Sequence, residues 1–222
     1  MHRPSRPEDL DDAGQVWARA VLLALLDAAQ GNREHWLDEQ GVWSENGGGS
    51  FWWRLTLVDD GHAVFCGQDS DGSHTHLDGR QIDFLAGGPE WLPWEQLRED
   101  AQGNLFGFLY WWQDGAWHRI PYPDALAEDG LAAAAPWLGS ERLFLAEAAE
   151  LAWVLREDEP AFAAAVTRFL RRAEERTVDA GAVAELLAAA GVGDDDREVL
   201  RFEPALDVAV RAGLTRHAPV PG

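Results

Sequence analysis

The fold is decided by residues 51–66, which read FWWRLTLVDDGHAVFC. Aromatic and β-branched residues are common in strands, and an Asp-Gly pair such as Asp60-Gly61 favours the tight turn of a hairpin. The stretch therefore predicts one strand over residues 51–58 and a second over residues 62–66. Side chains alternate between the two faces of a strand, so Trp52 and Trp53 point to opposite faces and both faces of this hairpin carry large rings.

The same pattern returns further along the chain. An aromatic run over residues 104–112 is followed by Asp114-Gly115 and then by residues 116–120, which predicts a second hairpin. Two hairpins imply an antiparallel sheet of at least four strands. In the long segment between them we expect a short strand near Arg80 to Leu85 and a short helix from Pro93 to Ala101.

Apolar residues recur at helical spacing from Leu10 to Ala29, which predicts a largely buried helix that ends at Gly31-Asn32. We expect a short helical or irregular stretch over residues 34–40. The glycine-rich run over residues 46–50 is interpreted as a flexible connector to the first hairpin.

After Pro136 the sequence is rich in alanine and shows only helical periodicity. We expect four helices there: one over residues 143–155, one that begins at Asp158-Glu159-Pro160, one around Val183 to Ala190 and one around Phe202 to Val210. The fold class is therefore α+β, with an N-terminal helix, an antiparallel sheet and a C-terminal helical bundle. The predicted domains are residues 1–137 and residues 138–222, unless the two form one continuous domain.

The composition excludes several reaction classes. The formal net charge is −21, and all 18 basic residues are arginine. Because the chain contains no lysine, it cannot supply the lysine of a P-loop or the amine of a pyridoxal or Schiff-base enzyme. We expect no cofactor. A charge of this size repels nucleic acid and anionic lipid and speeds encounter with cationic surfaces, so a cationic protein is the expected partner.

The expected compartment is the cytoplasm. Cys66 is the only cysteine, so no disulfide can form within the chain, and the first residues lack the apolar run of a secretory signal. The most apolar stretch, residues 18–29, is too short to cross a bilayer. A lone cysteine in a strand is typical of a small buried hydrophobic residue rather than of a nucleophile.

Tryptophan and acidic residues concentrate in the same part of the chain. Ten of the 12 tryptophans lie between Trp36 and Trp137, and residues 1–137 hold 23 of the 39 acidic residues. Aromatic anchors with a charged rim are typical of a protein-binding surface. The candidate partner-binding residues are two strand tryptophans and six loop acids: Trp52, Trp111, Asp59, Asp60, Asp69, Asp71, Asp78 and Asp83. In the opposing interpretation, the C-terminal helices cover the second face of the sheet and bury these rings.

Residues 69–78 suggest a different chemistry. If residues 73–78 are extended, His74, His76 and Asp78 project from one face, as a site of two histidines and one carboxylate for a metal requires. The alternative is a turn in which Asp and Ser side chains bond to their own backbone.

Three hypotheses follow. The first is a noncatalytic protein that binds a basic partner, in the manner of a bacterial immunity protein that neutralises a toxin. The second is a metal-dependent enzyme that uses the histidine and aspartate cluster. The third is a protein whose tryptophans stack on a sugar or another flat ligand.

Overall fold

The computed structural model describes residues 5–59, 61–103, 106–123, 126, 128–190 and 200–215. The chain groups into two compact units. Unit 1 contains residues 1–13 and 43–140, and unit 2 contains residues 14–42 and 141–222. Unit 1 ends at Ser140, and the first long helix groups with the C-terminal helices.

Six strands pair in the order β1-β2-β3-β4-β7-β8. Their bounds are β1 His35–Asp38, β2 Gly41–Glu45, β3 Phe51–Asp59, β4 His62–Asp69, β7 Phe108–Gln113 and β8 Ala116–His118. The pairs β3–β4, β4–β7 and β7–β8 are antiparallel. The predicted α+β fold with an antiparallel sheet built from hairpins is confirmed.

Both predicted hairpins are present. In the first, Asp59 lies opposite His62, so the chain reverses at the predicted place, although Asp60 itself lies outside the described residues. In the second, Asp114 and Gly115 both have positive φ, at 54° and 79°. Two successive residues with positive φ match the type I′ turn that Asp-Gly favours.

Two expectations for the preceding segment were wrong. Residues 34–40 are neither helical nor irregular, because they contain β1 and the turn to β2, where the Asp38 carboxylate accepts a hydrogen bond from the Gln40 amide at 2.8 Å. Residues 46–50 form an ordered turn rather than a flexible connector. The Asn46 side chain accepts a bond from the Ser50 amide at 2.7 Å, and the Asn46 carbonyl accepts one from the Gly49 amide at 2.8 Å. An Asn side chain that bonds forward in this way fixes the turn.

One face of the unit 1 sheet packs an aromatic core. Trp53 lies 5.6 Å from Phe65 and 5.9 Å from Trp137 between ring centroids, and Phe65 lies 5.7 Å from Phe108. All four side chains are buried. Gly67 faces the same side, and the Phe108 ring takes the space that a side chain there would need, since a Cβ would lie 2.7 Å from it. The tight fit explains why this strand position is a glycine.

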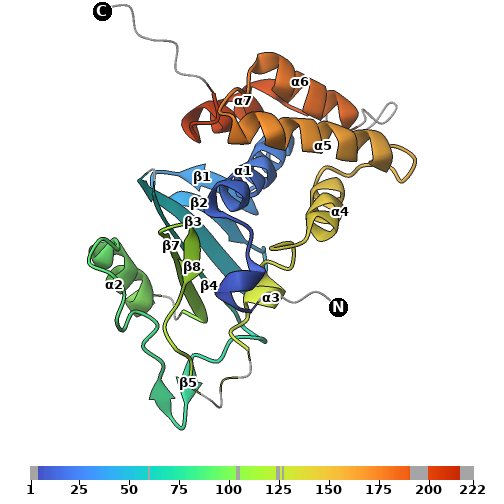
Figure 1. Ribbon diagram of the computed structural model, residues 1–222. Coiled ribbons are helices and arrows are strands. Elements are labelled where there is room, and N and C mark those ends of the chain that lie inside the picture. Colours follow the sequence, from blue (N-terminus) through green and yellow to red (C-terminus); the bar gives the residue numbers. More distant parts are fainter. Residues whose placement is uncertain are drawn as a thin grey trace, which may run out of the picture. The chain divides into compact units, whose positions relative to one another are not determined.

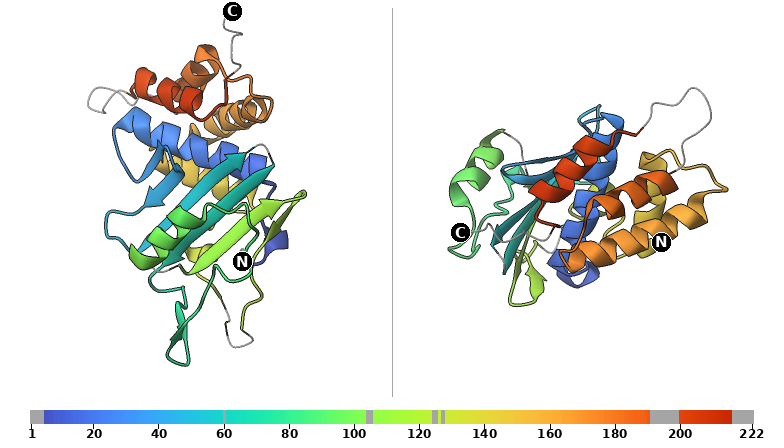
Figure 2. Two further views of the ribbon diagram at one scale, coloured as in Figure 1. Left: turned by 90° about the vertical axis from the view of Figure 1, so that its left-hand side faces the viewer. Right: turned by 90° about the horizontal axis from the view of Figure 1, so that it is seen from above.

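The opposite face of the sheet is covered from within unit 1. The helix α2 (Trp94–Gly103) and the segment before it lie over this face, as Figure 1 and Figure 2 show. The buried residues of this outer-face cluster are Val64, Cys66, Phe84, Leu92, Leu97, Phe106, Leu109 and Ile120. The expected helix near residues 93–101 is thus present, and it supplies the cover that the opposing interpretation assigned to the C-terminal helices.

The expected short strand near Arg80 is β6 (Arg80–Gln81), which pairs with β5 (His76–Leu77). These strands form a two-stranded sheet of their own rather than a part of the main sheet. Their hairpin projects beyond the end of the main sheet in Figure 1. Unit 1 also contains the short helices η1 (Pro7–Asp9) and α3 (Leu131–Ala134).

Unit 2 is mainly helical. It contains α1 (Ala13–Gln30), α4 (Glu141–Leu151), α5 (Glu159–Glu174), α6 (Ala180–Ala189) and α7 (Phe202–Arg211). The predicted order of helices after Pro136 is confirmed, except that α4 stops at Leu151 instead of continuing to residue 155. Within the described residues, no helix is both long and apolar enough to span a membrane.

Candidate functional site

The two tryptophans predicted to be binding anchors are half-buried. Trp52 and Trp111 both pack against the outer-face cluster, and the Trp52 ring lies 6.0 Å from Trp43 and 5.9 Å from Phe106. The Trp111 ring stacks on His118 at 6.3 Å. Because α2 and its neighbouring segment already cover this face, these rings contribute much of their surface to the fold of unit 1.

Two of the predicted acids, Asp59 and Asp69, stabilise turns with their carboxylates. The Asp59 carboxylate accepts hydrogen bonds from the Gly61 amide at 2.8 Å and from His62 Nδ1 at 2.9 Å. The hydrogen bond from His62 lowers the pKa of Asp59. Asp69 Oδ1 accepts bonds from the amides of Asp71 and Gly72 at 3.1 and 2.6 Å. These bonds are the local turn chemistry that the alternative interpretation of residues 69–78 predicted.

The candidate metal ligands are not brought together as a site. In the part of the chain that the structure describes, no group of three or more His, Cys, Asp or Glu side chains could hold a metal ion. His76 lies in β5 opposite Gln81, and its Nδ1 lies 3.0 Å from the Thr75 hydroxyl. Asp78 occupies the turn to β6 with a φ of 50°, and His74 is exposed on the segment before β5.

Asp78 and Asp83 are the predicted acids that share a surface groove. They line a volume of about 640 Å³ together with apolar residues of two chain segments. The complete lining is Leu77, Asp78, Arg80, Gln81, Ile82, Asp83, Ile120, Pro121 and Pro123. We call this the β5–β6 groove. Both carboxylates are exposed, and the Asp83 carboxylate also accepts a bond from the Leu85 amide at 3.0 Å.

A buried polar cluster anchors one wall of the β5–β6 groove. Asp129 is 1% exposed, and its Oδ2 accepts hydrogen bonds from the hydroxyls of Tyr110 and Tyr122, both at 2.6 Å. Burial raises the pKa of the Asp129 carboxyl. Because Tyr122 lies between the two prolines that line the groove, its bond to Asp129 holds this wall against the core of unit 1. No sequence pattern pointed to this cluster, in which Tyr122 and Tyr110 lie 7 and 19 residues before Asp129.

A second buried polar contact lies beneath α2. Arg54 is 1% exposed and forms an ion pair with Asp100 at 2.5 Å, and its guanidinium lies 4.7 Å from the centre of the Trp43 ring. Cys66 is fully buried nearby, and burial raises the pKa of its thiol to about 12. A nucleophilic cysteine needs access and a lowered pKa, so Cys66 has neither property of a catalytic thiol.

The candidate site of unit 1 is therefore the β5–β6 groove, with apolar walls and two exposed carboxylates. Comparison of the chain with protein-family models, with curated proteins and with solved structures finds no match. The fold and the groove define an acidic α+β protein with an open surface groove in unit 1.

Proposed function

We propose that this chain is a noncatalytic protein-binding module that binds a cationic protein in the cytoplasm, in the manner of an immunity protein that neutralises a basic toxin. The observation that carries the proposal is the β5–β6 groove, where the exposed carboxylates of Asp78 and Asp83, with Arg80 between them in sequence, accompany apolar walls. An apolar floor with a charged rim is the usual composition of a protein-binding surface.

The overall charge supports the same partner. Unit 1 contains 19 acidic residues and six arginines, so the groove lies within a strongly negative unit. Long-range attraction of this kind increases the rate at which a cationic protein arrives, whereas the apolar contacts slow its departure. The single cysteine, which is buried and unmodified by any disulfide, supports a reducing compartment.

The test distinguishes an effect of the carboxylates in the groove from an effect of the overall negative charge. Once a partner has been isolated by cross-linking, its association rate is measured by stopped flow over a range of salt concentrations. Asn is a suitable replacement at Asp78 because it tolerates positive φ, and at Asp83 because it keeps the acceptor for the Leu85 amide. We expect the double variant Asp78→Asn with Asp83→Asn to lower the association rate and its salt dependence.

The matched control is Asp114→Asn. Asp114 is an exposed acid of the same unit, lies in the β7–β8 turn and also has positive φ, so its replacement removes charge away from the groove without straining the backbone. We expect this control to change the association rate by less than half as much. An association rate that is indifferent to salt, or an equal loss in the control, would show that the groove is not the binding site.

A further inference from the structure

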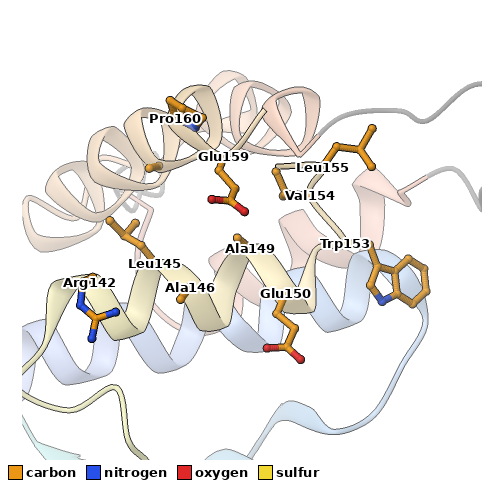
Figure 3. A pocket seen from close by; sticks show the side chains of 11 residues that line it. Arg142, Leu145, Ala146, Ala149, Glu150, Trp153, Val154, Leu155, Glu159 and Pro160 are labelled. Atoms are coloured by element: carbon orange, nitrogen blue, oxygen red, sulfur yellow. The ribbon is translucent and has the colours of Figure 1, made fainter. Parts of the chain in front are cut away.

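A groove of unit 2 lies between two helices of that unit. Figure 3 shows it between α4 and the first turns of α5, closed at one end by the segment that connects them. Its volume is about 820 Å³. Its apolar walls include Leu145, Ala149, Val154 and Pro160, and Arg142 lines the end opposite Trp153. We call this the α4–α5 groove.

Trp153 stands at the connecting end of this groove and is 52% exposed. Its backbone has a φ of 53°, and it ends α4 in a Schellman arrangement. The Val154 amide donates to the Ala149 carbonyl at 2.9 Å, and the Trp153 amide donates to the Glu150 carbonyl at 3.0 Å. Glycine is the usual residue at this left-handed position, because a side chain there is strained.

A large apolar side chain at such a position therefore contributes little to the fold. Trp153 strains the helix end, and half of its surface is exposed to water instead of being buried in a core. Local rules of this kind are broken most often where a residue serves binding. Trp is also the residue most enriched at the centres of protein interfaces.

Acidic side chains outnumber basic ones in the groove and in the pocket beside it. Figure 3 shows the Glu159 side chain pointing into the groove from α5, whereas the Glu150 side chain points away from α5 on the far side of α4. Trp153 and Glu150 also line an adjoining pocket of about 440 Å³ that contains Glu34 and Glu147 together with Arg33 and His35. Burial, together with the charges of Glu150 and Glu34, raises the pKa of Glu147, although His35 opposes the shift. A cation at this end of the groove would relieve the repulsion among these carboxylates.

We propose that the α4–α5 groove binds a cationic amphipathic helix of another protein. Apolar side chains of that helix pack between Leu145 and Val154, and an Arg or Lys lies against the face of the Trp153 ring, close to the carboxylates of the adjoining pocket. The length of α4 fits this occupant, since 11 residues span about 16 Å, or three helical turns. This site lies in unit 2 and does not depend on the role proposed for the β5–β6 groove.

The probe is a synthetic helical peptide of 14 residues, built from Ala with Leu on one face and Arg beside that face. Binding to the full chain is measured by calorimetry and by the shift of the Trp153 indole N–H resonance, which is assigned by its loss in Trp153→Phe. We expect Trp153→Gly to weaken binding by at least about tenfold, as the loss of a central tryptophan does elsewhere.

The stability of the same variant gives the decisive contrast. Glycine relieves the backbone at positive φ, so Trp153→Gly should leave the urea midpoint of unfolding unchanged or raise it while binding is lost. Trp153→Asn serves as a second variant, because Asn also tolerates this backbone conformation. The matched control is Val210→Ala, which trims an apolar side chain that is 49% exposed on α7. Binding should be unchanged in that control.

Each remaining outcome is informative. A peptide with Gln in place of every Arg should bind at least about tenfold more weakly, and equal binding would overturn the cationic part of the proposal. Retained binding in Trp153→Gly, or no shift of the indole resonance at millimolar peptide, would overturn the site itself. The double variant Asp78→Asn with Asp83→Asn should bind the peptide normally, so a failure of the proposed function and a failure of this inference remain distinguishable.

Discussion

Replacing Asp100 tests the buried ion pair beneath α2. Arg54 is 1% exposed and the Asp100 side chain 17% exposed, with 2.5 Å between Arg54 Nη2 and Asp100 Oδ2. Removing one partner of a fully buried pair costs about 3–5 kcal/mol, since the other charge stays behind unpaired. Asp100→Asn keeps a neutral acceptor, and the Trp43 ring keeps its attraction for the guanidinium, so we expect a loss of about 2–3 kcal/mol.

Urea unfolding followed by tryptophan fluorescence measures this loss. Nine of the 12 tryptophans belong to unit 1, so the signal reports mainly on the unit that contains the pair. A loss of this size should lower the urea midpoint by about 1 M. The control is Glu99→Gln, which removes an exposed charge from the same helix and should change stability by less than about 0.5 kcal/mol. An Asp100→Asn variant as stable as this control would refute the argument that the ion pair is effectively buried.

Three other measurements test the structure. Between about pH 9 and pH 12 the folded state keeps the Cys66 proton that the unfolded state loses, so stability should fall as the pH rises through this range, and Cys66→Ala should reduce the slope. Gly67→Ala should lower the free energy of unfolding by about 2–3 kcal/mol, because the new Cβ would lie 2.7 Å from the Phe108 ring and 2.9 Å from the Trp53 Cα. The control Gly47→Ala has open space around it and should lower the free energy of unfolding by less than about 0.5 kcal/mol. Elemental analysis of the purified protein should find no stoichiometric transition metal, and tight binding that is lost on replacing His74 and His76 by Ala would instead favour a metal enzyme.

The hairpins could be predicted because their signals are local. Alternating aromatic residues and an Asp-Gly pair specify strand, turn and strand within about 16 residues, and the turn at Asp114-Gly115 has the two positive φ angles that this pair favours. The segment over residues 34–40 gave no such signal. It contains a strand of four residues and no glycine at the two central positions of its turn, so its pairing depends on neighbouring strands rather than on its own sequence.

The covering of the sheet could not be predicted, for a related reason. Alternation along residues 51–58 correctly placed Trp52 and Trp53 on opposite faces, but the sequence does not specify which distant segment packs on the face of Trp52. The structure places α2 over that face, with Asp100 beside Arg54. Trp52 and Trp111 are therefore half-buried within unit 1. The abundance of tryptophan in this part of the sequence reflects packing as much as recognition.

Trp153 was not among the predicted binding residues. The prediction followed the region of the sequence in which tryptophan is concentrated, and Trp153 lies outside that region. The periodicity of α4 was extended to residue 155, which placed this ring inside a helix instead of at its end. A sequence signal was present, since Glu157, Asp158 and Pro160 mark the start of the next helix and leave room for a helix end before them. A helix end without glycine, with a tryptophan at the left-handed position, is a combination that packing alone does not favour. Variants at Trp153 therefore test where this chain binds its partners. The partner could contact the region rich in aromatic residues, or it could contact a position at which an aromatic residue lowers the stability of the fold.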